Sequence, residues 1–225
     1  MGPAVIFSEW DDVSAKGFDA VMRGTVLEAD GPTGALLSTK QAARRQRIVD
    51  AAMAMLEDRE FERIQVKDIA DGASVALGTV YHYFSSKEHL FGEVLVQWAG
   101  SLRTSITRRS LAGADPAARL EDALHRSVRA FERRPPLARL VARLQVSEDP
   151  FAVDVLARLD AVTNEVYLAA LEDLEPTVAA RVVRVADAVL DSSLRSWSAG
   201  RLPIADVYRS LSDAVALLLG GDRGR

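Results

Sequence analysis

The sequence predicts an all-α protein with an N-terminal three-helix helix-turn-helix domain followed by a larger helical domain. Apolar residues recur at helical spacing through nearly all of the chain after residue 40. The strict alternation of β-branched residues that indicates strands is missing. Prolines and glycines recur at intervals typical of helix boundaries, because a proline lacks a backbone N–H and clashes with the preceding turn. Together these three observations favour a fold built from helices alone.

The composition excludes several kinds of site. The 225 residues are 48% hydrophobic and 27% charged, which is ordinary for a globular protein. The chain has no cysteine, so it can hold neither a disulfide, nor a thiolate nucleophile, nor a cysteine-based zinc site. With only three histidines, a His-rich metal site is also disfavoured. We therefore expect no metal and no cofactor.

The beginning of the chain does not have the pattern of a secretory signal. Its apolar start is short, and Glu9 and Asp11 follow at once. Apolar runs elsewhere are far shorter than the roughly 20 residues that span a bilayer. We expect a cytoplasmic protein without a membrane partner.

Residues 1–37 are rich in glycine and show no sustained amphipathic pattern, which predicts a mobile arm with a short helix near Phe18–Leu27. The arm holds six acidic and two basic residues and so accounts for the whole net charge of -4. The rest of the chain is neutral, with a basic cluster at Lys40, Arg44, Arg45 and Arg47.

The predicted domain of residues 38–90 begins with a helix start signal. Ser38 and Gln41 have the spacing of a capping box, and the helix that follows is expected to end near Arg59. Two short helices are predicted at Val66–Ala73 and Leu77–Tyr83. Ser86 is placed to cap a longer helix that runs through Trp98 and beyond.

Each of the two short helices has an apolar stripe, at Val66, Ile69 and Ala70 and then at Val75, Val80 and Phe84. Two short helices with few residues between them pack at a steep angle onto the first helix, which is a helix-turn-helix. A solvated helical hairpin is the alternative. The exposed aromatic run predicted at Tyr81–Tyr83 favours a contact surface instead.

A helix fits the DNA major groove, where a tyrosine ring or threonine methyl contacts a thymine methyl and polar side chains reach base edges. Residues near a helix N-terminus, such as Lys87, are placed to bind the phosphate backbone. The predicted DNA contacts are Lys40, Arg44, Arg45, Gln65, Lys67, Leu77, Gly78, Thr79, Tyr81, His82 and Lys87. An acidic arm beside such a surface would compete with the phosphates.

The segment from about Arg44 to Leu95, and above all Gly78–Lys87, resembles the DNA-binding domain of the TetR family of one-component transcription regulators. The resemblance implies that Thr79, Tyr81, His82 and Lys87 contact DNA and that Val80 and Phe84 belong to the core. Three positions depart from the family pattern. Ser74 and Glu60 stand where glycine is usual, and Ala76 stands where a Ser or Thr usually caps the second short helix.

For residues 91–221 the same resemblance implies a helical effector-binding and dimerisation domain. The helix boundaries after residue 115 predict about five helices there. The segments Arg184–Leu219 and Val75–Thr79 resemble the corresponding sequences of the steroid-catabolism repressors of actinobacteria (the KstR type). That resemblance implies a small hydrophobic effector such as the CoA thioester of a steroid or another bulky acyl group.

Large apolar residues are candidates to line an effector cavity, since ligand sites in helical bundles lie between the helices. The predicted pocket residues are Trp98, Phe131, Leu144, Phe151, Tyr167 and Trp197. Each of them is also explained by simple core packing. Basic residues near one face of a helix are candidates to bind phosphates or to be a solvated face: Arg119, Arg126, Arg129 and Arg133.

The last two helices carry apolar stripes that suit a homodimer with two-fold symmetry, although intramolecular core explains such stripes as well. The predicted interface residues are Val189, Leu190, Ser193, Trp197, Tyr208, Leu211 and Val215.

These observations predict a homodimeric repressor that binds a palindromic double-stranded DNA operator and is released by its effector. An enzyme is disfavoured, because no Ser/His/Asp order, paired-carboxylate context or phosphate-binding glycine loop is present, and we predict no catalytic residue. An acyl-CoA- or lipid-binding protein without DNA binding remains an alternative, because Glu60, Ser74 and Ala76 depart from the family pattern.

Overall fold

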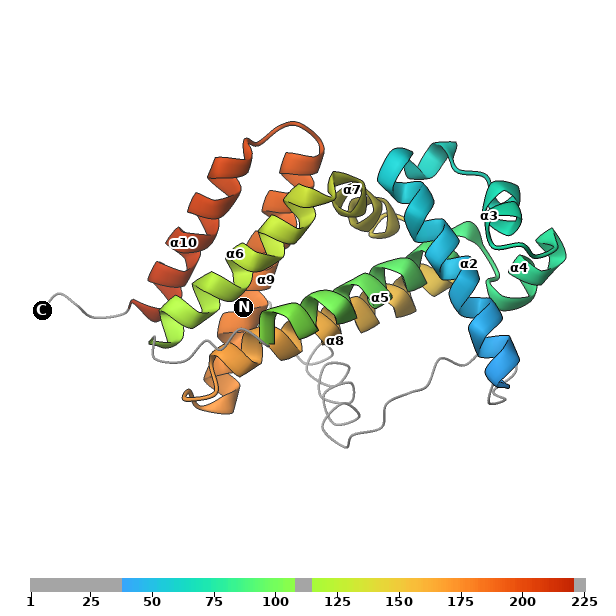
Figure 1. Cartoon of the computed structure of the whole chain (residues 1–225). Coiled ribbons are helices and arrows are strands. Elements are labelled where there is room, and N and C mark those ends of the chain that lie inside the picture. Colours follow the sequence, from blue (N-terminus) through green and yellow to red (C-terminus); the bar gives the residue numbers. More distant parts are fainter. Residues whose placement is uncertain (1–37, 108–114, 221–225) are drawn as a thin grey trace, which may run out of the picture. The chain divides into compact units, whose positions relative to one another are not determined.

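The computed structural model describes residues 38–107 and 115–220, so the predicted arm and its short helix lie outside the described residues. Every regular element in the described part is a helix, which confirms the predicted fold class (Figure 1). From Thr39 on, the chain forms one compact unit. None of the described helices combines the length and the apolar character that a membrane span requires.

The first elements make the predicted helix-turn-helix. They are α2 (Thr39–Asp58), the 3-10 helix η1 (Phe61–Arg63), α3 (Val66–Gly72) and α4 (Leu77–Tyr83). The bounds of α4 agree with the prediction, and those of α2 and α3 differ from it by one residue at the C-terminal end. Helix η1 was not expected from the sequence. Its Phe61 is buried and meets Phe91 edge to face at 5.2 Å between ring centroids.

Helix α5 (Lys87–Thr107) joins the two parts of the unit. Its start is capped as predicted, because the Ser86 hydroxyl accepts a hydrogen bond of 2.9 Å from the His89 backbone N–H. The helix runs through the predicted domain boundary at residue 90. The helix-turn-helix and the larger helical part therefore share one continuous helix.

Four later helices begin at prolines: α6 (Pro116–Arg133), α7 (Pro135–Leu144), α8 (Pro150–Ala170) and α9 (Pro176–Ser198). The residues before three of these prolines accept hydrogen bonds from free backbone N–H groups of the first turn: Asp115, Asp149 and Glu175. The last helix is α10 (Ile204–Leu219), which follows Pro203. The five helices expected after residue 115 are thus all present.

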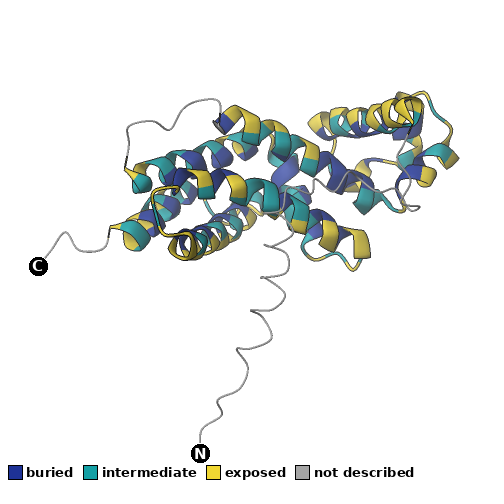
Figure 2. Ribbon diagram, turned by 90° about the horizontal axis from the view of Figure 1, so that it is seen from below, coloured by how far each residue is buried: buried dark blue, intermediate teal, exposed yellow. Residues whose placement is uncertain are grey.

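Helices α5 and α8 lie side by side along most of their length (Figure 1). Gly92 allows this approach, because a Cβ placed there would lie 2.5 Å from Cγ1 of Val155 on α8. Buried residues occupy the helix faces that turn toward neighbouring helices, and exposed residues occupy the outer faces (Figure 2). This close contact positions α8 beside α5, the helix that continues from the helix-turn-helix.

Candidate DNA-binding and effector sites

Two of the three departures from the family pattern lie in the turn between α3 and α4, and each is expected to destabilise that turn. Ser74 has φ 54°, and no other non-glycine residue in the described ranges has a positive φ. Serine adopts this conformation less readily than glycine. Ala76 precedes α4 and lacks a capping side chain, although its carbonyl accepts a 2.8 Å hydrogen bond from the Thr79 N–H. The turn is nevertheless formed, and α4 begins where predicted.

Helix α4 buries one face and exposes the other. Val80, Tyr83 and Phe84 are buried, which confirms the core role expected for Val80 and Phe84. The expectation that Tyr83 is exposed with Tyr81 and His82 is wrong, because its ring packs against Phe84 in the core. Register explains the difference, since residue 83 lies one helical turn after Val80 and so shares its buried face.

The outer face of α4 presents the residues predicted to contact DNA. Tyr81 is 52% exposed and Leu77 is 41% exposed, although large hydrophobic side chains are usually buried. His82 is exposed, and a Cβ added at Gly78 would meet nothing within 4 Å. Thr79 is partly exposed at the edge of this face. We call the face formed by Leu77, Gly78, Tyr81 and His82 the α4 surface.

The predicted DNA contacts outside α4 and the turn before it divide into exposed residues and residues that contact other parts of the chain. Lys40 and Arg44 on α2 are exposed, as are Gln65 and Lys67 at the start of α3. Arg45 and Lys87 instead have partners inside the unit. Their contacts mean that both residues contribute to holding the helix-turn-helix together, whatever else they bind.

Lys87 lies over the ring of Phe61, with its Nζ 4.1 Å from the ring centroid, and donates a hydrogen bond to the Phe61 carbonyl oxygen. Partial burial lowers the pKa of Lys87 below its ordinary value, although the nearby Glu62 and Glu88 oppose this.

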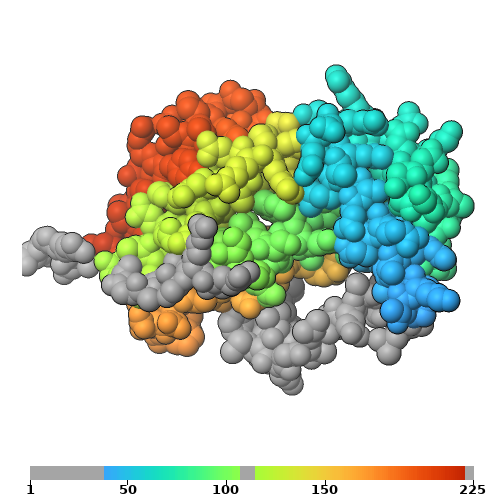
Figure 3. Space-filling view, viewed as in Figure 1, coloured from blue at the N-terminus to red at the C-terminus, as the bar shows by residue number. Residues whose placement is uncertain are grey.

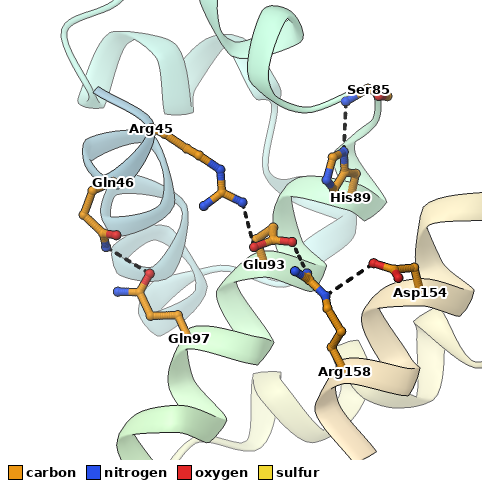
Figure 4. A network of polar contacts seen from close by, with 8 residues as sticks. All are labelled: Arg45, Gln46, Ser85, His89, Glu93, Gln97, Asp154 and Arg158. Atoms are coloured by element: carbon orange, nitrogen blue, oxygen red, sulfur yellow. Dashed lines mark hydrogen bonds and ion pairs between the residues drawn. The ribbon is translucent and has the colours of Figure 1, made fainter. Parts of the chain in front are cut away.

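Arg45 belongs to a polar network between α2, α5 and α8 (Figure 4). Its guanidinium lies 2.7 Å from Glu93, whose other carboxylate oxygen accepts from Arg158 on α8. Arg158 also pairs with Asp154 at 3.3 Å. Burial by itself would raise the pKa of Glu93, but the charges and hydrogen bonds of Arg45 and Arg158 outweigh it and lower the pKa.

An aromatic contact accompanies this network. The rings of His89 on α5 and Phe151 on α8 are stacked, with centroids 4.4 Å apart and an interplanar angle of 5°. The Ser85 backbone N–H donates to Nδ1 of His89 over 3.2 Å. Burial lowers the pKa of His89, so the imidazole in this stack is neutral near pH 7. Phe151, predicted to line the effector pocket, therefore lies beside the helix-turn-helix.

Two further ion pairs join the end of α2 to the corner between α6 and α7. Arg134 lies 3.3 Å from Glu57, and Arg139 makes two hydrogen bonds of 2.8 and 2.6 Å to Glu60. Glu60 is one of the departures from the family pattern, and its carboxylate thus has a defined partner. Neither pair was expected from the sequence, because the partners stand 77 and 79 residues apart and no local pattern relates them.

The predicted pocket residues differ in their burial and in their contacts. Trp98 and Phe131 are in contact, with ring centroids 4.7 Å apart. Leu144 and Tyr167 are fully buried, and the Tyr167 hydroxyl donates a 2.9 Å hydrogen bond to Ser127. Trp197 is half-buried on α9. The structure thus brings Trp98 and Phe131 into direct contact.

Two adjoining cavities lie between α2, α5 and the α6–α7 corner, where the surface is hollowed (Figure 3). Their volumes are about 210 and 450 Å³. Met53, Arg133 and Arg134 line both, and Trp98 lines the larger one. Three other arginines are candidates for phosphate ligands or for a solvated face. Arg119 pairs with Asp173 and Arg126 with Asp122, while Arg129 hydrogen-bonds Tyr208.

The predicted dimer residues are mostly turned inward. Leu211 and Val215 on α10 are buried in the chain itself, as are Leu190 and Ser193 on α9. Val189, Trp197 and Tyr208 are half-buried, and the Tyr208 hydroxyl donates to Glu132 over 3.0 Å. The large apolar residues that α9 and α10 expose are Val178, Val185 and Leu217.

Comparison with known proteins agrees with this architecture. Residues 48–94 match the bacterial regulatory proteins of the tetR family, and residues 113–218 match the tetracyclin repressor-like C-terminal domain. The HTH-type transcriptional repressor KstR of Mycobacterium tuberculosis is 34% identical over 202 residues, which cover 89% of this chain and 90% of that protein. KstR of Rhodococcus jostii is 32% identical over 186 residues, covering 82% and 87% respectively.

Solved structures share the fold. A TetR transcriptional regulator from Rhodococcus sp. RHA1 superposes with a TM-score of 0.71 at 26% identity, covering 81% of this chain and 98% of that one. Thermus thermophilus FadR in complex with lauroyl-CoA has a TM-score of 0.66 at 24% identity, over 80% and 96%. From the matched domains and the identity to KstR repressors over most of its length, the chain belongs to the TetR family of DNA-binding transcription regulators.

Proposed function

We propose that the protein is a homodimeric repressor that binds a palindromic operator through α4 and is released by a bulky acyl-CoA, such as a steroid thioester. The α4 surface carries the DNA part of this proposal. Tyr81 and Leu77 expose large apolar areas on a short helix whose opposite face is fully packed. Such exposure on a folded domain marks a contact surface. We expect the protein in the cytoplasm, and we propose that operator DNA there is the partner of the α4 surface.

A second copy of the chain is proposed to pack on α9 and α10. Val178 and Val185 are 44% and 45% exposed on α9, and Leu217 is 84% exposed on α10. A two-fold dimer would cover these side chains and present the two copies of α4 to the two half-sites of an operator. Helix-turn-helix dimers read half-sites about 34–36 Å apart, which is one turn of DNA.

The effector part of the proposal is supported by the larger cavity, which Trp98 lines, and by two similarities to known proteins. The KstR repressors are similar over most of the chain. The fold is shared with a FadR solved with lauroyl-CoA and with a Bacillus subtilis FadR solved with stearoyl-CoA. An effector releases DNA only if it binds the released state more tightly than the operator-bound state.

Two measurements test the proposal. Gel-shift assays with the DNA upstream of its own gene should show a sequence-specific complex, and binding without sequence preference would contradict the repressor. A thermal-shift screen of acyl-CoAs should find a thioester that stabilises the protein by mass action. If thioesters bind but operator DNA does not, the alternative of an acyl-CoA-binding protein without DNA binding is favoured.

A further inference from the structure

The two cavities at the α2, α5 and α6–α7 meeting point combine an apolar wall with two adjacent guanidinium groups. Met53, Leu56 and Leu137 line the smaller cavity, and Trp98 and Leu102 line the larger one. Arg133 and Arg134 line both. Ligand sites commonly have this composition, with apolar walls for bulk and a few polar groups that fix orientation.

The two arginines are available to an anion for different reasons. Arg133 is exposed and makes no ion pair or side-chain hydrogen bond with any residue of the described ranges. Arg134 is paired with Glu57, but the side chains are 45% and 55% exposed and 3.3 Å apart. An exposed pair of this kind contributes little to stability. A phosphate or carboxylate that reaches both guanidiniums would therefore displace Glu57 at small cost.

Displacing Glu57 has a consequence for α2. Glu57 lies on α2, the helix against which α3 packs, and Arg134 lies at the end of α6 in the larger helical part. An anion in the cavity would remove one of the two ion pairs at this corner and repel the freed Glu57 carboxylate. Arg139 with Glu60, just beyond the end of α2, would then be the remaining ion pair of the two.

We infer that this cavity pair binds an apolar molecule carrying an anionic group, with Arg133 and Arg134 as the anion ligands, and that occupancy loosens α2 by replacing Glu57. The inference rests on the proposed function, since it assigns a place and a charged group to the effector. The anionic group is the phosphate of an acyl-CoA or the carboxylate of a free acid, and the test distinguishes them.

The test uses the full chain and measures binding by thermal shift and calorimetry, together with release of its operator fragment. The probes are lauroyl-CoA, dodecanoate and free CoA, joined by any thioester found in the screen. The variants are Arg133→Gln and Arg134→Gln. Arg201→Gln, in the exposed α9–α10 turn away from the cavities, is the matched control for charge. Release by each variant is normalised to its own operator affinity without a probe.

We expect the wild-type protein and Arg201→Gln to bind a probe equally, and Arg133→Gln to bind it about 10- to 100-fold more weakly, the usual effect of losing one charged hydrogen bond. Arg134→Gln should also raise the operator dissociation rate without any probe, because it removes the Glu57 pair. If dodecanoate binds and the thioesters do not, the anionic group is a carboxylate. If lauroyl-CoA or the screened thioester binds and dodecanoate does not, the anionic group is the CoA phosphate.

Two results would overturn the inference. If the wild-type protein and Arg133→Gln bind a thioester with equal affinity, the effector lies elsewhere and the proposed function still stands. If no probe binds the wild-type protein, the proposed effector class fails and this inference fails with it.

Discussion

Arg139 on α7 donates two hydrogen bonds, 2.8 and 2.6 Å long, to the carboxylate of Glu60 in the helix-turn-helix. Glu60 is one of the positions at which the sequence departs from the pattern that the family resemblance implies, and the pair joins it directly to the larger helical part. A departure from the family pattern therefore forms a contact between the helix-turn-helix and the larger helical part of the chain.

A double-mutant cycle should measure this contact. Glu60→Ala and Arg139→Ala are each expected to lower the free energy of unfolding slightly, with a coupling energy of about 0.5 kcal/mol, because both side chains are 40–45% exposed. Urea denaturation of the four proteins gives the coupling. A coupling of zero would show that the pair is not maintained in solution.

The network around Glu93 should matter more, because its carboxylate is only 10% exposed. Glu93→Gln leaves Arg45 and Arg158 without their shared anion and is expected to lower the free energy of unfolding by about 2 kcal/mol. The lowered pKa of Glu93 also predicts a pH dependence. Its stabilisation is present above the unfolded-state pKa, on the order of pH 4, and is lost as the pH falls through the folded-state value.

Comparing unfolding curves of wild-type protein and Glu93→Gln between pH 3 and 7 checks this. The difference in stability should shrink as the pH falls. A constant difference across that range would contradict the assigned charge on Glu93.

Asp187 on α9 should behave in the opposite way. Its burial and the charge of Asp191 raise its pKa to about 6. The protonated form is then favoured in the folded protein, so its stabilisation is complete below the unfolded-state pKa and is lost as the pH rises to about 6. Asp187→Asn is expected to raise the melting temperature at pH 8 but not at pH 4. Asp213→Asn, an exposed change on α10, is the matched control and should show no such difference.

The close packing of α5 on α8 predicts a steric effect at Gly92. Gly92→Ala puts a Cβ against Val155 and is expected to destabilise the protein by about 1–3 kcal/mol, and Val155→Ala in the same chain should recover part of the loss. Gly100→Ala on the same helix is the control, because a Cβ there meets nothing within 4 Å. It is expected to stabilise by about 0.5–1 kcal/mol, since alanine favours helices over glycine. Equal effects of the two changes on the unfolding midpoint would contradict the close approach.

Local signals predicted the fold well. The prolines at 116, 135, 150 and 176 begin helices, since each fixes φ and lacks an N–H that the first turn does not need. The bounds of α4 and the cap at Ser86 agree with the prediction for similar reasons, because caps and stripes depend on neighbours within one or two turns.

Partners distant in the sequence were not predictable in this way. Glu93 pairs with Arg45 and Arg158, which stand 48 and 65 residues away, and nothing in the local sequence indicates either pair. The prediction for Tyr83 was wrong because the aromatic run was treated as one surface, although successive helix positions face different sides. The DNA, effector and dimer contacts of the individual residues stay predictions.

The central claim is that the exposed face of α4 binds the operator, and Tyr81→Ala tests it most directly. Fluorescence anisotropy with a labelled operator fragment measures the affinity, and circular dichroism checks that the helices are intact. Val146→Ala, which truncates an exposed apolar side chain in the loop between α7 and α8, is the control. We predict that Tyr81→Ala lowers operator affinity roughly 5- to 150-fold, the effect of losing a contact of 1–3 kcal/mol, while Val146→Ala leaves it unchanged. Equal operator affinity of Tyr81→Ala and the wild-type protein, with helices intact in both, would contradict the account.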